Sequence, residues 1–342
     1  MSYKSDQYKN ATKFKAGLQD SEEDDYVLMV EGNPFYHFFK KTWLNLWENI
    51  QEDALKYFAQ KGITWHTNNM ENNQETVPEG DMLSSQISCV NHLFLLRKKE
   101  EYATAILKNI DKRIVSAEIV RDGYGDDGYI EFEFWGTKEN HNPLNEKEEG
   151  YIRGKYWKRQ RGSFSTSVDA VMVGKKIDGN NLLILLEWKF TEDYTKNYGD
   201  RNIFKPKKTS NSKSYDKLLG GRNSPIDTSH LKFFEDLYYE PFYQLMRQTL
   251  LGWKMIETNE LGCNEYVHLH IIPKENLKIQ EITSSNLKLG NKNMSDVWKN
   301  LLKEPFKYKL LSPEELLLPL RNNQNFKDFF DYLNRRYLEK NI

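Results

Sequence analysis

The chain has 342 residues, enough for one large domain or two modest ones, and long enough to bury a sizeable core. Apolar residues make up 38% and charged residues 29%, so we expect a globular protein with a very polar surface. The aromatic content of 13% argues against general disorder. The net charge of −1 does not by itself indicate a nucleic-acid binder, although phosphate contacts need only one basic face.

The cysteines and the N-terminus predict the compartment. Cys89 and Cys263 are far apart and have no C-x-x-C or Cys/His partners, so neither a disulfide framework nor a zinc site is expected. The first ten residues are polar and lack the apolar core of a signal peptide. No apolar run approaches the roughly 20 residues that span a bilayer. We therefore expect a cytoplasmic protein with no membrane partner.

The N-terminal part of the chain predicts two helices. The first twenty-odd residues look loosely ordered. From 35 to 58, apolar residues recur at helical spacing and predict an amphipathic helix that faces a core. Residues 67–80 are polar and end in Pro78 and Gly80, which predicts a loop. A second helix is predicted from Ser84 or Ser85, residues typical of an N-cap, to Ile110.

The pattern then changes to the period of strands. Residues 129–134 alternate, and the apolar runs 167–173 and 182–190 are separated by turn formers, which predicts a β-hairpin. Helical spacing returns over 235–257, residues 265–272 alternate as a strand, and the chain is helical from about 297. This order predicts a mixed α/β sheet with extra helices at both ends.

The predicted hairpin carries residues that indicate chemistry. Glu187 and Lys189 stand two positions apart at the end of a buried strand, so they share a face. If the turn centres near Asp178, the antiparallel register places Asp169 opposite Glu187, about 5 Å away. Facing carboxylates repel unless a cation lies between them, and Mg²⁺ suits oxygen ligands. With the lysine on the scissile phosphate, this geometry predicts phosphodiester hydrolysis; the alternative is a structural ion pair at the strand ends.

Two basic stretches flank the hairpin. Residues 151–162 contain five Lys or Arg and no acidic residue, and residues 196–222 are rich in Lys and Arg among Gly, Ser, Asn and Pro. Each run could be an ordinary solvated surface. Their position beside the predicted site favours contacts to phosphate, with Lys158 and Arg161 as the DNA-binding candidates in the first stretch.

The order strand–Asp, turn, apolar strand, Glu-x-Lys resembles the PD-(D/E)XK nuclease superfamily. More narrowly, three stretches resemble a bacterial restriction-endonuclease-like family within it: Ser84-Ser85-Gln86 with Asn91, Arg161-Gly162 leading to Thr166-Ser167-Val168-Asp169-Ala170, and Glu187-Trp188-Lys189-Phe190-Thr191-Glu192. The resemblance covers roughly residues 84 to 255, about half the chain. Val168 stands where the superfamily's name has proline, a position that varies there.

The resemblance implies a restriction-endonuclease-like core of order αβββαβ with a mixed sheet. It implies Asp169 and Glu187 as Mg²⁺ ligands, Lys189 as the catalytic lysine and the carbonyl of Trp188 as an additional ligand. Many superfamily members carry a further acid upstream. Glu146 lies at a suitable distance before Asp169, and we favour it over its rival Glu133, which could be a surface position of the strand.

The helix predicted over 235–257 carries polar residues of interest. Gln244 can share one face with Arg247 or Gln248. In the superfamily such a helix often faces the active site, so Gln244 and Arg247 are candidates for steadying the DNA phosphate. The alternative is an exposed polar stripe on a core helix. His268 and His270 could pair on a metal, but no third ligand is nearby, so core or surface histidines are the better interpretation.

We therefore predict an N-terminal helical extension (1–83), a nuclease core (84–275) and a C-terminal helical extension (276–342). The predicted function is a Mg²⁺-dependent DNA endonuclease of restriction or defence type. The alternatives are a non-cleaving nucleic-acid-binding protein on the same fold, and a nuclease for RNA or structured DNA. Cutting both strands of a duplex would favour a homodimer, but no segment identifies an interface.

Overall fold

A computed structural model describes residues 2–18, 26–30, 32–66, 77–152, 155–194, 205–207, 209–288 and 292–337. Its centre is a mixed sheet in the order β10-β9-β8-β7-β3, with β4 also paired to β7. The strands are β3 (Ile114–Glu118), β4 (Glu131–Phe134), β7 (Val168–Lys176), β8 (Asn181–Trp188), β9 (Cys263–Ile271) and β10 (Tyr308–Leu311). Strand β7 is antiparallel to β3, β4 and β8, whereas β8, β9 and β10 are parallel.

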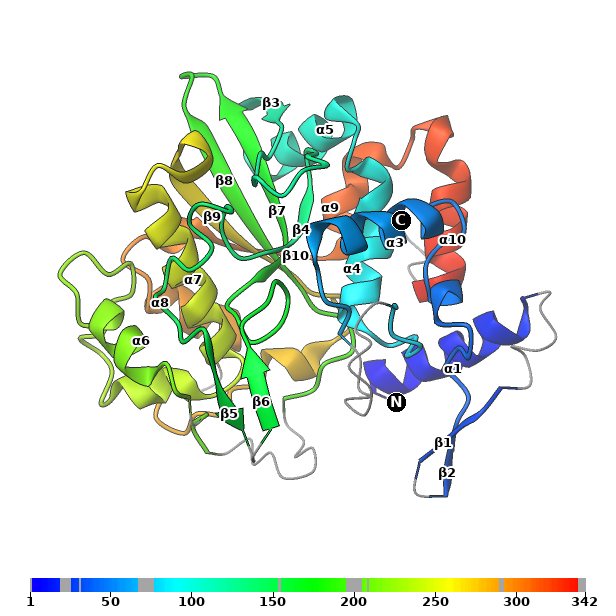
Figure 1. The fold of residues 1–342 in the computed structure, drawn as a ribbon, viewed down its shortest axis with the longest axis horizontal. Coiled ribbons are helices and arrows are strands. Elements are labelled where there is room, and N and C mark those ends of the chain that lie inside the picture. The colour runs from blue at the N-terminus through cyan, green and yellow to red at the C-terminus, as the bar shows by residue number, and fades with distance from the viewer. Residues whose placement is uncertain are drawn as a thin grey trace.

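Helices cover both faces of this sheet (Figure 1). One layer contains α3 (Gln51–Lys61), α4 (Ser85–Leu93), α5 (Glu100–Ile110), α9 (Pro313–Leu317) and α10 (Lys327–Tyr337), and α1 (Tyr3–Ala16) packs beside α10. The other layer contains α6 (Ser212–Leu219), α7 (Phe242–Glu257) and α8 (Met294–Asn300). Alternate residues of β8 enter the two cores, Leu186 one and Leu185 the other, as the pleat requires. The predicted α/β class is confirmed.

Shorter elements complete the chain. Two separate two-stranded sheets are formed by β1 (Leu28–Val30) with β2 (Asn33–Phe35), and by β5 (Glu149–Ile152) with β6 (Lys155–Lys158). The 3-10 helices are η1 (Thr42–Asn45), η2 (Phe94–Leu96), η3 (Phe234–Tyr238), η4 (Glu260–Gly262), η5 (Leu277–Gln280), η6 (Pro305–Lys307), η7 (Leu318–Leu320) and η8 (Gln324–Phe326). No helix in the described ranges has both the length and the apolar character needed to cross a bilayer.

The hairpin prediction is confirmed as β7 and β8, and the helix predicted from Ser84 to Ile110 is present in two parts. The Ser84 hydroxyl accepts a hydrogen bond from the backbone N–H of Ile87 and caps α4. A 3-10 turn, η2, and three further residues then separate α4 from α5. The predicted strand at 265–272 is β9, and the helix predicted over 235–257 is η3 followed by α7.

Three predictions about the ends of the chain are wrong. The segment from 35 to 58 is α-helical only from Gln51 and has one 3-10 turn, η1, before it. Backbone hydrogen bonds from Phe39 to Gly80 and from Met82 to His37 hold its first part against a distant loop. The first residues are not loose but form α1. The C-terminal extension contains a strand, β10, which pairs with β9. Of the loop predicted at 67–80, residues 67–76 lie outside the described residues.

Candidate functional site

Asp169 on β7 and Glu187 on β8 face each other across the hairpin. The ladder pairs Ala170 with Leu186, and one further step in the same register places Asp169 opposite Glu187. Oδ2 of Asp169 accepts a hydrogen bond of 2.6 Å from the backbone N–H of Trp188. The register inferred from the sequence is therefore confirmed, and the two carboxylates share one end of the hairpin.

Lys189 directly follows β8 and lies against Glu187. Its Nζ is 2.5 Å from Oε1 of Glu187, and the two residues are buried, 6% and 4% exposed. Burial alone would lower the pKa of Lys189, but the Glu187 carboxylate raises it well above the ordinary value. Lys189 is thus a fixed positive charge beside the facing carboxylates.

A third carboxylate, Glu133 on β4, lies on the other side of β7. Its neighbours in β4 pair with Ala170 and Val168, so Glu133 falls opposite Asp169. Its φ of 47° lies in the left-handed region, which is uncommon for a residue with a side chain. Glu133, Asp169 and Glu187 therefore form a row across three neighbouring strands, which we call the carboxylate row.

The members of the carboxylate row repel one another. Burial, followed by the charges of Glu187 and Glu133, raises the pKa of Asp169 well above its ordinary value. Burial also raises the pKa of Glu133, and Glu187 adds to that shift. Carboxylates held together at this cost form a donor set that suits a hard divalent cation.

Two amide side chains bind the outer members of the carboxylate row. Nε2 of Gln248, on α7, donates to Oε2 of Glu187 and to the carbonyl of Ser167. Nε2 of Gln86, on α4, donates to Oε1 of Glu133 at 2.7 Å. The amide oxygen of Gln248, Oε1, is buried and accepts no hydrogen bond from the residues that the structure describes. Such an acceptor beside Glu187 suits a water or a cation at this place.

The carboxylates are directed at protein donors rather than at one common point. Within the described ranges, no group of three or more His, Cys, Asp and Glu side chains has a geometry that could hold a metal ion. Asp169 is bonded to the N–H of Trp188, and Glu187 to Lys189 and Gln248. The donor chemistry fits Mg²⁺, but these side chains must exchange some of their protein contacts to bind it.

Glu146, the favoured upstream acid, lies in a separate cluster. Its carboxylate accepts hydrogen bonds from the backbone N–H of Thr166 at 2.8 Å, the hydroxyls of Thr166 and Tyr215, each at 2.5 Å, and Nε of Arg159 at 3.3 Å. Burial alone would raise the pKa of Glu146, but Arg247 and these hydrogen bonds hold it below its ordinary value. Glu133, the rival candidate, is the acid that lies opposite Asp169. Glu146 instead connects the segments that contain Arg159, Thr166 and Tyr215.

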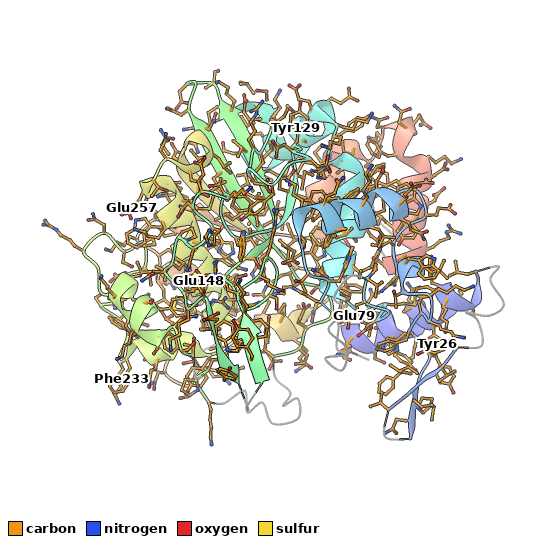
Figure 2. The ribbon with its side chains drawn as sticks, in the orientation of Figure 1. Tyr26, Glu79, Tyr129, Glu148, Phe233 and Glu257 are labelled. Atoms are coloured by element: carbon orange, nitrogen blue, oxygen red, sulfur yellow. The ribbon has the colours of Figure 1, made fainter. Side chains whose placement is uncertain are left out.

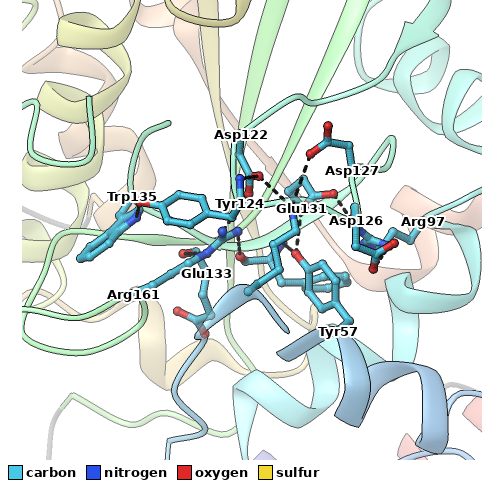
Figure 3. Close-up of polar contacts among 12 residues, drawn as sticks. Tyr57, Arg97, Asp122, Tyr124, Asp126, Asp127, Glu131, Glu133, Trp135 and Arg161 are labelled. Carbon is cyan, nitrogen blue, oxygen red and sulfur yellow. Dashed lines mark hydrogen bonds and ion pairs between the residues drawn. The ribbon is translucent and has the colours of Figure 1, made fainter. Parts of the chain in front are cut away.

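Arg161, predicted as a DNA contact, is buried and only 2% exposed. Its NH1 donates to Oδ2 of Asp122 at 2.8 Å, and NH2 and Nε donate to the carbonyls of Phe132 and Glu133 at 2.7 and 3.2 Å. Figure 3 shows Arg161 lying along this part of β4. The prediction is corrected: an Arg whose donors are used inside the protein supports the strand that carries Glu133, and has no donor group at the surface for phosphate.

Asp122 belongs to a larger buried ion network. Nζ of Lys61 lies 2.7 Å from Asp122 and 2.6 Å from Glu131, and Arg97 lies 2.7 Å from Glu131. In Figure 3 the carboxylate of Glu133 points away from this network. Glu131 and Glu133 are two positions apart in one strand yet serve different clusters, consistent with the left-handed backbone at Glu133.

The other predicted DNA contacts differ in availability. Lys158 on β6 is exposed and free to reach a phosphate. Gln244 accepts a hydrogen bond from the hydroxyl of Tyr194 at 3.0 Å, and partly exposed Arg247 donates to the hydroxyl of Thr166 at 2.8 Å. Neither has a described contact with the carboxylate row, which Gln248 reaches instead. In the second basic stretch, residues 195–204 and 208 lie outside the described residues, as does Arg153 in the first.

His268 and His270 are core residues, as the better interpretation held. Burial, with a smaller effect of Lys189, lowers the pKa of His268 to about 3 and that of His270 well below its ordinary value. The hydroxyls of Thr249 and Tyr308 lie 3.3 and 3.1 Å from the Nδ1 atoms of His268 and His270. Both rings are therefore neutral, His268 beside Thr249 of α7 and His270 beside Tyr308 of β10.

Sequence reasoning assigned no role to Gln86, and it named Gln248 only as a residue that can share a face with Gln244, without choosing it as a site residue. Gln86 belongs to the quoted stretch Ser84-Ser85-Gln86, and Gln248 follows Gln244 by one helical turn, so each carried a weak signal. Neither signal shows which polar residue of a helix faces a strand end, because that depends on how the helix is rotated against the sheet.

A family model described as "Restriction Endonuclease associating with ARP" matches residues 4–338. The match includes both terminal segments as well as the stretch with the carboxylate row. Comparisons with curated proteins and with solved structures gave no match.

Proposed function

Because the chain belongs to the family of restriction endonucleases associating with ARP, we propose that it is a Mg²⁺-dependent endonuclease that hydrolyses DNA phosphodiester bonds. The observation that carries this proposal is the carboxylate row with Lys189 beside it. The proposed class is the PD-(D/E)XK type. The order α4/α5, β4, β7, β8, α7, β9 supports it, with β3 and the β5–β6 pair as additions to the core.

The residues of the site have separate proposed roles. Asp169 and Glu187 hold the cation, and Glu133 takes the part of the upstream acid in place of Glu146. Lys189 binds a non-bridging oxygen of the scissile phosphate or orients the attacking water, as a buried point charge can. Gln86 and Gln248 keep the outer carboxylates in place. A bound Mg²⁺ would lower the pKa of a coordinated water and stabilise charge on the phosphate.

Lys189 and the cation compete for Glu187 in this proposal. Nζ of Lys189 lies 2.5 Å from Oε1 of Glu187, so the ammonium occupies one of the carboxylate oxygens that would hold the cation. With Glu187 as a ligand of a bound cation, the ammonium of Lys189 would be free to bind the phosphate of the substrate, which would match its charge. The residues therefore support a lysine whose partner changes between the resting and substrate-bound states.

Plasmid cleavage with and without Mg²⁺ tests the proposal, with wild type compared with Glu187→Gln and with Glu257→Gln as a surface control on α7. We expect metal-dependent nicking or linearisation by wild type and by Glu257→Gln, and none by Glu187→Gln. The melting temperatures show whether each variant is folded. Full cleavage by folded Glu187→Gln would exclude this site as the active site.

A further inference from the structure

The strands β5 and β6 form a small ribbon (residues 149–158, here the β5–β6 ribbon) that pairs with no other strand in the described part of the chain. Its two faces differ. Tyr151 pairs with Tyr156 and Glu149 with Lys158, so these four residues share one face. The other face carries Trp157, which stacks on Phe164 at 5.2 Å between ring centroids.

The residues that the structure describes leave the tyrosine face largely exposed. Tyr151 is 74% exposed and Tyr156 is 55% exposed, and their rings contact each other edge to face at 5.5 Å. Lys158 and Glu149 on the same face are also exposed. The Tyr156 hydroxyl donates to Oε2 of Glu149, so the one carboxylate of this face already has a donor. Two adjacent aromatic rings left in water, next to a lysine, are typical of a binding surface.

Hydrogen bonds connect the end of the β5–β6 ribbon that contains Glu149 and Lys158 with the segment before Asp169. Glu148, which lies just before β5 and is labelled in Figure 2, accepts a hydrogen bond from the backbone N–H of Arg159 at 2.7 Å. The Arg159 side chain bonds to Glu146, and Glu146 bonds to the N–H of Thr166, three residues before Asp169. Whatever binds the tyrosine face is therefore held at a fixed position relative to the site of cleavage.

We propose that the tyrosine face of the β5–β6 ribbon stacks on unpaired bases of the DNA strand that is cut. Aromatic rings beside a basic residue are the chemistry that binds exposed bases on a phosphate backbone. Lys158 is the exposed basic residue described on this face, and the Glu149 carboxylate opposite it already accepts a hydrogen bond from Tyr156. The inference rests on the proposed nuclease function and deepens it. It assigns the substrate class as single-stranded DNA, or duplex DNA opened next to the scissile phosphate.

Binding measurements without divalent metal test this inference, because no cleavage is then expected. Fluorescence anisotropy and quenching of 2-aminopurine would be compared for single-stranded DNA, blunt duplex DNA and RNA of equal length and matching sequence. The variants are Tyr151→Ala/Tyr156→Ala, the ring-preserving pair Tyr151→Phe/Tyr156→Phe, and Phe233→Ala as a control. Phe233 is 58% exposed on another surface (Figure 2).

We expect the double alanine variant to lose roughly tenfold or more of its affinity for single-stranded DNA, and to quench 2-aminopurine less. Duplex affinity and melting temperature should change little, and the phenylalanine pair and Phe233→Ala should bind as wild type. Unchanged single-strand affinity, or an equal loss on blunt duplex, would overturn base stacking. Tighter binding of RNA than of DNA would overturn the assignment to DNA. Cleavage is scored separately, so failure of either proposal is distinguishable from failure of the other.

Discussion

Asp169 lies between two other carboxylates, and its raised pKa shows that the ionised side chain is disfavoured there. We expect Asp169→Asn to abolish Mg²⁺-dependent cleavage while raising the free energy of unfolding of the metal-free protein, because a neutral amide removes the repulsion between neighbouring carboxylates. Urea denaturation in EDTA measures this, with Asp328→Asn as a surface control. A less stable Asp169→Asn protein would show that Asp169 is a structural carboxylate.

Glu133 and Glu146 are distinguished by a matched pair of variants. Glu133→Gln should lower cleavage and Mg²⁺ affinity by at least ten- to hundredfold, since it removes a proposed ligand. Glu146→Gln should leave metal affinity near wild type and instead lower stability by roughly 1–3 kcal/mol, since its donors lose their charged acceptor. Calorimetric titration with Mg²⁺ and thermal denaturation of both proteins make the comparison. The reverse pattern would restore Glu146 as the upstream acid.

The lowered pKa of Glu146 also predicts a pH dependence. A carboxyl whose folded pKa lies below its unfolded value of about 4.3 contributes stability that is present above that value and lost as the pH falls through the folded pKa. We expect the stability of wild type to fall in this acid range, and that of Glu146→Gln to fall less steeply. Denaturation midpoints between about pH 3 and 6 measure the slopes; parallel slopes would contradict the assignment.

Sequence patterns identify Asp169, Glu187 and Lys189 because strand period and hairpin register depend on local spacing. They do not identify Glu133 as the third member, because a left-handed residue inside a strand breaks the alternation on which such reasoning depends. Arg161 shows the same limit in another form. Its stretch has the charge pattern of a basic surface, and only the position of Asp122 in space makes it a buried ion partner.

Strand β4 depends on Arg161, which donates to two successive carbonyls next to Glu133. We expect Arg161→Lys to lower the melting temperature and to weaken Mg²⁺ binding by roughly tenfold, because a lysine keeps the charge but not the planar set of donors. Arg113→Lys, at a half-exposed ion pair with Asp111, is the control and should change stability by less than about 1 kcal/mol.

Wild-type stability and Mg²⁺ affinity in Arg161→Lys would contradict the proposal that Arg161 supports β4 through its planar set of donors. If its charge alone mattered, as for a phosphate contact, Arg161→Lys would keep both stability and metal affinity. If its role were only structural, stability would fall with no change in the affinity of the folded protein for Mg²⁺.

The elements that were predicted well are those with strong local patterns, such as the β7–β8 hairpin and α7. Strands β3 and β10 are short and escape a pattern search, because their place in the sheet comes from pairing with β7 and β9. The aromatic spacing over 35–50 resembles a helix, but the side chain of Asn45 bonds to the carbonyls of Glu79 and Asp81 and holds the segment in another conformation. Contacts with residues far away in the sequence determine the conformation of these segments.

Hydrogen bonds connect the N-terminal and C-terminal segments with each other and with the segment predicted as the nuclease core. Nε2 of Gln7 on α1 donates to the carbonyl of Tyr337 at the end of α10, and the Tyr337 hydroxyl accepts from Asn91 on α4. Arg336 donates to the carbonyl of Met82. The end of α10 thus contacts the helix that carries Gln86, and α1 in turn packs on α10. The match of the family over residues 4–338 agrees with a unit that includes both ends.

We propose that Glu133, Asp169 and Glu187 hold one divalent cation. Crystals soaked with Mn²⁺, a stand-in for Mg²⁺, and measured near the manganese absorption edge would locate it by anomalous scattering. We predict a peak between Asp169 and Glu187, within ligand distance of a Glu133 oxygen or of a water bound to it, with Lys189 moved off Glu187. A peak only elsewhere, or an undisturbed Lys189–Glu187 pair with no peak at the carboxylate row, would contradict the account.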